Sequence, residues 1–208
     1  MRDKIKATAT VLLIKNGYAR LRFADIAEAL NITRANIHYH FGTKSKLVDE
    51  VLIEYVALTT DRMATVWCSD MSYEQKVIAT MELNRERYLL FNKSNECGGA
   101  PWSLISRMRL ESNLVGPEAR ASLVTFSRSM ERYVADAIAQ AQVNGEITRN
   151  APVNDIAVQI LSIIESAGPI TQDAGSFERL EHLYMAHMRV IAHAYVTKRK
   201  RVPHVAAS

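Results

Sequence analysis

The chain of 208 residues is predicted to be all-α, with a small amino-terminal helical domain and a larger helical body. Apolar residues recur three and four positions apart through most of the sequence, the spacing that puts them on one face of a helix. No segment has the alternating apolar and polar pattern of a half-buried strand, and no internal repeat is found. Eight glycines and five prolines are few enough to allow long helices.

The first helix is expected over residues 3–16. Its inner face is formed by apolar residues at helical spacing, namely Ile5, Ala9, Leu12 and Leu13. Gly17 is expected to end this helix, because glycine adopts the backbone conformations that stop one. A long helix over residues 44–67, capped by the Thr43 hydroxyl, is predicted to join the two domains as a rod.

Five more helices are expected downstream, over residues 73–92, 101–113, 117–144, 152–167 and 177–197. Prolines lie near three of the starts, where a missing amide hydrogen costs least: Pro101, Pro117 and Pro152. We therefore divide the chain into an amino-terminal domain over residues 1–46, a larger helical body over 47–197, and a basic flexible tail over 198–208.

Residues 22–47, reading RFADIAEALNITRANIHYHFGTKSKL, carry the most specific pattern in the chain. A helix over residues 23–30 would present one apolar face, formed by Ile26, Ala27 and Leu30. Asn31 follows where the chain must reverse, and asparagine tolerates the left-handed conformation that such a turn needs. Thr33 can then cap a second helix. This is the layout of a helix-turn-helix, which inserts its second helix into the major groove of DNA.

The second helix of this pair, over residues 34–40, has only Ile37 clearly facing inward. Its other faces carry polar or aromatic side chains, namely Arg34, Asn36, His38, Tyr39 and His40. A helix this short with so little apolar surface does not stabilise itself well. Contact with a nucleic acid accounts for the side chains that it exposes.

Charge is distributed unevenly along the chain. Residues 1–46 hold nine lysines and arginines against three acidic residues, whereas residues 47–197 hold 13 against 19. One basic end on an acidic body is expected if only that end approaches DNA, where charge drives affinity and makes it salt-dependent. The basic cluster at residues 198–201 is interpreted instead as part of a frayed, solvated tail.

These residues resemble the TetR (tetracycline-repressor) family of bacterial transcriptional regulators. The resemblance covers about residues 5–50, and its most specific part is the ending Tyr39-His40-Phe41 with Lys44 and Leu47. The remaining matches are Gly17-Tyr18, Asp25-Ile26-Ala27, Ile32-Thr33 and Ile37. The resemblance implies a ligand-responsive DNA-binding regulator, most often a repressor that leaves a near-palindromic operator when a small molecule binds the body.

The family pattern also implies roles for single residues of the helix-turn-helix. Four positions would face base edges: Arg34, Ala35, Asn36 and His38. Four others would hold the DNA backbone: Thr33, Tyr39, His40 and Lys44.

Three positions depart from that pattern. Arg22 stands where the family usually has a hydroxyl cap, and its charge could reach a phosphate. Asn31 replaces the usual turn glycine, and His38 replaces the first aromatic residue of a pair. The departure at His38 leaves its contact with DNA the least defined of the set.

The middle helices carry large, adaptable apolar side chains that could line a pocket for a small-molecule effector. With a cysteine of the intervening loop, the candidates are Met63, Trp67, Phe91, Cys97, Trp102, Met108, Phe126, Met130 and Tyr133. The alternative is that most of them form ordinary core. In the family that the chain resembles, a ligand between these helices swings the DNA-binding units apart through the fourth helix, and such coupling is typically about 1 to 3 kcal/mol.

The last two helices offer apolar faces that could pair with a second copy of the chain. The candidates are Ile156, Ile160, Ile163, Ile164, Leu180, Leu183, Tyr184 and Ile191. In the resembled family the corresponding pair forms a four-helix dimer interface, which implies a homodimer reading two half-sites roughly 34 Å apart. The alternative is that these stripes fill the core of a single chain.

Cys97 lies in a glycine-rich segment before an expected helix, where a helix amide end could favour the reactive thiolate. A thiol- or electrophile-sensing regulator is therefore one alternative, although Glu96 would oppose thiolate formation. An enzyme using Cys97 is another, but no phosphate-binding glycine loop, metal-ligand spacing or serine-elbow motif supports it. A DNA-binding protein without an effector is a third.

The sequence predicts neither a metal nor a cofactor. Two cysteines, Cys68 and Cys97, form no metal pattern and no disulfide framework, so a reducing cytoplasm is expected. No apolar run reaches the about 18 residues of a membrane span, and the first residues lack a secretory apolar region. The expected partners are double-stranded operator DNA, an effector and a second copy of the chain.

Overall fold

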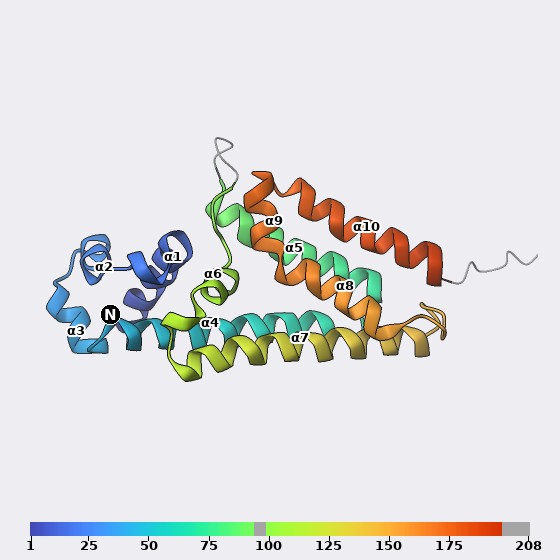
Figure 1. The fold of residues 1–208 in the computed structure, drawn as a ribbon, viewed down its shortest axis with the longest axis horizontal. Helices are drawn as coiled ribbons and strands as arrows, with labels where there is room; N and C mark the ends of the chain where they lie inside the picture. The colour runs from blue at the N-terminus through green and yellow to red at the C-terminus, as the bar shows by residue number, and fades with distance from the viewer. Residues whose placement is uncertain (94–98, 197–208) are drawn as a thin grey trace, which may run out of the picture.

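The computed structural model describes residues 1–93 and 99–196 (Figure 1). Within this part of the chain all regular structure is helical, as the sequence predicts. The helices are α1 (Arg2–Arg20), α2 (Phe23–Leu30), α3 (Arg34–Phe41), α4 (Lys44–Trp67), α5 (Tyr73–Phe91), α6 (Leu104–Leu110), α7 (Pro117–Val143), α8 (Val153–Glu165), α9 (Ala167–Ala174) and α10 (Glu178–Tyr195), with a 3₁₀ turn at Ser112–Leu114.

Helices α1 to α3 form a small head at one end of the molecule (Figure 1). Its core consists of apolar side chains that are fully buried, namely Ile5, Leu13, Ile26, Ile37 and Leu47. Leu47 belongs to α4, so the first turn of the long helix is built into the head. The rest of α4 continues into the body, which makes it the continuous link that the sequence predicts between the two parts.

The body is built on α4 and α7, which lie along each other for most of their length (Figure 1). Helices α5, α8, α9 and α10 cover them, and α10 packs against α5, α8 and α9. Two pairs of polar side chains lie in this core. The Tyr73 hydroxyl lies 2.6 Å from His187 Nε2, and Asn84 donates to the Tyr184 hydroxyl at 2.8 Å.

Helix α6 bridges the body and the head. It packs against α1 and α4. The Glu111 carboxylate that follows it accepts a hydrogen bond from the Tyr18 amide and forms an ion pair with Arg107. Gly17 makes this approach possible, since its φ of 77° lies outside the helical region and a Cβ there would collide with both side chains. The joint between head and body therefore depends on a glycine.

Several boundaries differ from those predicted. Gly17 kinks α1, and helical turns resume up to Arg20 instead of ending at residue 16. Pro101 does not start a helix, because α6 begins at Leu104 behind a Ser103 cap. Helix α9 was not predicted.

Helix α9 escaped prediction because its sequence contains two residues that usually break helices. Pro169 lies in its first turn, where the amide hydrogen has no partner within the helix in any case. Gly168 faces Ser103 and Ser106, and a Cβ there would lie 3.2 Å from the Ser106 hydroxyl. Glycine and proline thus allow a short helix to pack tightly against α6.

Candidate nucleic-acid interface and pocket

The turn between α2 and α3 has the geometry that the sequence predicts. Asn31 is the C-cap of α2 in the left-handed conformation, with φ 51° and ψ 50°. Thr33 caps α3 by accepting a hydrogen bond from the Asn36 amide at 3.3 Å. Thr43 caps α4 in the same way, accepting from the Lys46 amide at 3.2 Å. These local contacts fix the direction of α3 relative to the head.

Helix α3 presents its polar face to solvent. Ile37 and Phe41 anchor the inner face in the head. Arg34, Ala35 and Tyr39 lie on the outer face, and Tyr39 is 85% exposed despite its large apolar ring. An aromatic side chain left in solvent at the tip of a domain is available for contact with a partner.

Two of the proposed base-contacting residues are less free than the sequence suggested. Asn36 is half-buried, and its Oδ1 is shielded from solvent with no hydrogen-bond partner among the described residues. His38 Nδ1 lies 2.9 Å from the Gly42 carbonyl oxygen, and its ring packs edge-on against Phe23. His38 therefore closes the end of α3 as well as facing solvent.

The proposed phosphate contacts border this face. Lys44 Nζ lies 4.5 Å from the centre of the Tyr18 ring and 3.4 Å from the Ala19 carbonyl oxygen. Burial lowers the pKa of this ammonium group, while Glu111 opposes the shift. His40 is half-buried and its ring packs edge-on against that of Tyr39.

Arg22 forms an exposed ion pair within the head. Its guanidinium lies 2.7 Å from the Asp25 carboxylate, and this hydrogen bond lowers the pKa of Asp25. Arg22 must therefore exchange or share this partner if it is to bind a phosphate. Helix α2 therefore starts without the side-chain hydrogen bond that a hydroxyl residue of the family pattern would supply at position 22.

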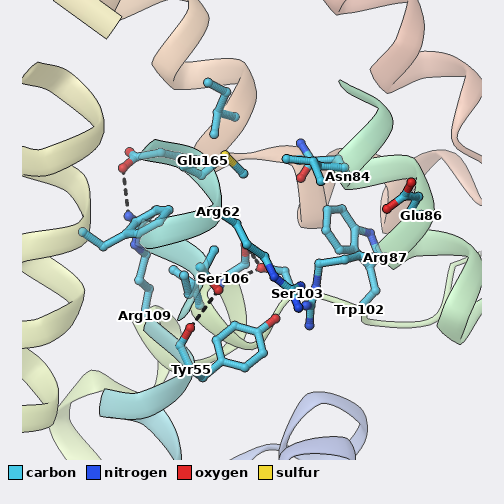
Figure 2. Close-up of a pocket in the computed structure, with 17 residues that line it drawn as sticks. Tyr55, Arg62, Asn84, Glu86, Arg87, Trp102, Ser103, Ser106, Arg109 and Glu165 are labelled. Carbon is cyan, nitrogen blue, oxygen red and sulfur yellow. Dashed lines mark hydrogen bonds and ion pairs between the residues drawn. The ribbon is translucent and has the colours of Figure 1, made fainter. Parts of the chain in front are cut away.

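A pocket opens in the body between α4, α5, α6, α7 and α8 (Figure 2). The volume in which the centre of a water-sized group can lie is about 80 Å³. Its deep wall is apolar and largely buried, formed by Met63, Trp102, Ile105, Phe126 and Ile164. Its polar lining includes three arginines, Arg62, Arg87 and Arg109.

Three of the nine predicted pocket residues line this space: Met63, Trp102 and Phe126. Two methionines and a tryptophan predicted for it are instead core residues, since Trp67, Met108 and Met130 are buried away from the pocket. Phe91 and Tyr133 are half-buried elsewhere. Cys97 lies outside the described residues. Helical spacing identified the apolar set but could not separate core from cavity.

The charged lining of the pocket was not predicted from the sequence. Arg62, Arg87 and Arg109 come from α4, α5 and α6, which are far apart in the chain. Each would ordinarily be read as part of a solvated helix face. Only the packing of three helices brings them to one place.

Residues 5–51 match the family model described as "Bacterial regulatory proteins, tetR family". This segment contains the turn, the caps and the exposed face of α3 described above. The amino-terminal head therefore matches the TetR family of bacterial regulatory proteins. This match favours a regulator over an enzyme built on Cys97.

Two curated relatives are similar to parts of this chain. The HTH-type transcriptional regulator QacR of Staphylococcus aureus is 33% identical over 94 residues, which cover 45% of this chain and 44% of QacR. IcaR, the negative regulator of the biofilm operon icaADBC in the same species, is 36% identical over 50 residues, covering 24% and 27%. The chain thus spans less than half the length of these relatives.

Solved structures show the same fold over nearly the whole chain. A TetR transcriptional regulator from Chloroflexus aurantiacus has a TM-score of 0.76 with 20% identity, and the match covers 95% of this chain and 96% of that one. A regulator from Saccharomonospora viridis, solved in complex with choline, has a TM-score of 0.73 with 23% identity, covering 95% and 98%. These likenesses establish that the body, as well as the head, has the TetR-family fold.

Most of the residues predicted for a dimer interface are buried within one chain. This set comprises Ile156, Ile160, Ile164, Leu180, Tyr184 and Ile191. Because α8 and α10 pack on the body, their main apolar stripes form part of its core, and these six side chains leave little surface for a second chain. Ile163 and Leu183 are half-buried. Val158 on α8 and Val190 on α10 are 59% and 56% exposed.

Two further observations concern the part of the chain that the structure describes. None of its helices is long and apolar enough to cross a lipid bilayer. No group of three or more histidine, cysteine or acidic side chains in it could hold a metal ion.

Proposed function

We propose that the chain is a transcriptional repressor that binds operator DNA as a homodimer and leaves it when a small molecule occupies the body pocket. The observation that carries this proposal is the outer face of α3, where Arg34, Ala35 and Tyr39 stand exposed on a rigidly capped helix. A helix of this kind fits the major groove, with its first residues at base edges and its end near phosphates.

Charge supports the same assignment. The first 46 residues carry an excess of six positive charges, whereas residues 47–197 carry an equal excess of negative charge. Positive charge on the head attracts the phosphate backbone, and negative charge on the body keeps the rest of the protein away from it.

Two helices connect the pocket with the head. Tyr55, Thr59 and Met63 of α4 line the pocket, and Leu47 of the same helix is built into the head. Ser106 and Arg109 of α6 also line it, while Glu111 after α6 binds the Tyr18 amide. A ligand that displaces α6 or α4 therefore changes the position of α3, which gives effector and DNA a common element to act on.

The direct test selects bound duplexes from a random DNA pool with the full chain. We expect a near-palindromic sequence with two half-sites, bound by a dimer. Tyr39→Ala should weaken this binding roughly tenfold or more, because the ring is 85% exposed and available to contact DNA. Tyr133→Ala on α7 is the matched control and should bind normally. Failure to enrich any sequence at low ionic strength would refute the proposal.

A permanently bound repressor without an effector is the second candidate. The pocket argues against it, since a protein that needs no ligand has no use for an apolar cavity edged with charged groups. Small molecules that bind the pocket yet leave the operator complex intact would favour this second candidate. Thiol sensing through Cys97 remains a prediction from the sequence.

A further inference from the structure

The pocket has an apolar interior and a positively charged rim. Trp102, Phe126 and Ile164 form part of the buried wall. Arg62 is exposed and Arg87 is half-buried at the edge, where they line the same space. A ligand complementary to this arrangement has an apolar part inside and a negative group at the edge.

Arg62 and Arg87 converge on Tyr55 without a carboxylate to neutralise them. Figure 2 shows both guanidinium groups turned toward the Tyr55 hydroxyl. The Arg87 guanidinium lies 4.8 Å from the centre of the Tyr55 ring. Among residues 1–93 and 99–196 neither arginine forms an ion pair, and Arg87 Nε is shielded from solvent without a hydrogen-bond partner. Two like charges held together in this way are unfavourable until an anion joins them.

The neighbouring groups favour an anion as well. Burial raises the pKa of the Tyr55 hydroxyl, so it remains protonated and can donate a hydrogen bond. Two acidic residues also line the pocket, but the Glu165 carboxylate lies 2.8 Å from Arg109 and is already neutralised. Glu86 is exposed and lies apart from the two arginines (Figure 2). Among the lining residues that the structure describes, no acidic group is therefore free inside the pocket to hold a cation.

We propose that the pocket binds a small organic carboxylate, with its acid group between the guanidiniums of Arg62 and Arg87 and its apolar part against Trp102 and Phe126. The inference rests on the proposed function, whose effector it assigns to a chemical class. Planar guanidinium groups match the two oxygens of a carboxylate. The apolar wall formed by Trp102 and Phe126 suits an aromatic ring as the apolar part.

The test compares aromatic probes whose polar group is negative, neutral or positive, using calorimetry and tryptophan fluorescence on the full chain. Benzoate, phenylacetate and cinnamate should bind, whereas benzamide and benzylamine should bind at least about tenfold more weakly. Arg62→Gln and Arg87→Gln should each reduce affinity for the carboxylates by about tenfold or more. Arg149→Gln, an exposed arginine remote from the pocket, is the matched control and should leave that affinity unchanged.

Three results would overturn the inference: no carboxylate binds at about 10 mM, benzylamine binds as tightly as the acids, or the two pocket variants bind them normally. A second measurement separates this inference from the proposed function. If carboxylates bind through Arg62 and Arg87 but the selected operator stays bound, the ligand class holds and the release mechanism fails. If benzylamine alone releases the operator, the release mechanism holds and the ligand class fails.

Discussion

At the scale of single residues, His187 shows how burial controls charge in the body. Its side chain is enclosed beside Tyr73, and desolvation lowers its pKa from 6.5 to about 4. The imidazole is therefore neutral at pH 7 in the folded protein. The unfolded chain binds a proton at this residue below about pH 6.5, whereas the folded chain does so only near pH 4, so folding is disfavoured as the pH falls through this window.

We predict that the free energy of unfolding falls by about 2 kcal/mol between pH 7.5 and pH 5 through His187 alone. In His187→Gln, whose amide oxygen can still accept from the Tyr73 hydroxyl, this part of the pH dependence should vanish. Urea denaturation of both proteins at the two pH values measures the difference. Parallel pH dependences in wild type and variant would show that His187 does not carry this effect.

Lys44 is expected to contribute to DNA binding mainly through its positive charge. Its ammonium group rests against the Tyr18 ring at the edge of the α3 face. We predict that Lys44→Ala weakens binding to specific and unrelated duplexes alike and lowers the slope of log K against log salt by about one. Fluorescence anisotropy over a salt series measures both. Lys15→Ala, an exposed lysine on α1, is the control, and equal slopes in wild type and Lys44→Ala would contradict the assignment.

At the scale of elements, local signals were predictable and packed surfaces were not. The caps at Thr33 and Thr43 and the turn at Asn31 depend on neighbouring residues, so the sequence alone predicted them. The bounds of α4 were predicted for the same reason. Helix α9 was missed because Gly168 and Pro169 stop helices in isolation, and only contact with α6 explains their presence.

The same distinction applies to the two candidate sites. Exposed residues of α3 follow from the helix-turn-helix pattern, so most of that face was predicted. The arginines of the pocket come from three helices and have no common signal in the sequence. Apolar stripes on α8 and α10 were predicted as an interface, but an apolar stripe packs equally well on its own body.

The joint between head and body at Gly17 can be tested by substitution. Its backbone has φ 77° and ψ 176°, a region that glycine alone adopts readily, and the Arg107 and Glu111 side chains occupy the space of a Cβ. We predict that Gly17→Ala destabilises the protein by about 1 to 3 kcal/mol and weakens operator binding. Thermal unfolding and DNA binding together measure this.

Gly145→Ala is the control, since Gly145 also has a positive φ of 75° but nothing near its missing Cβ. It should lower stability without weakening DNA binding. If both variants bind operator equally well, the joint at Gly17 does not position the head.

At the scale of the whole molecule, the proposed function requires a dimer that presents two heads to one operator. We propose that the two chains meet through the outer faces of α8 and α10, where Val158 and Val190 are exposed. We predict that Val190→Glu converts the dimer largely to monomer, because a buried unpaired charge opposes association. Analytical ultracentrifugation measures the change. Val143→Glu, at a more exposed valine near the end of α7, should remain dimeric, and a dimeric Val190→Glu would exclude this surface.

Chemical footprinting of the full chain on its selected operator tests the central claim most directly. If α3 of each subunit enters the major groove, guanine N7 atoms should be protected from methylation in two segments whose centres are about one helical turn, roughly 34 Å, apart. Protection should be lost in Tyr39→Ala at the same protein concentration. Unprotected N7 atoms throughout a saturated complex, or protection unchanged by Tyr39→Ala, would contradict the claim that this helix reads the groove.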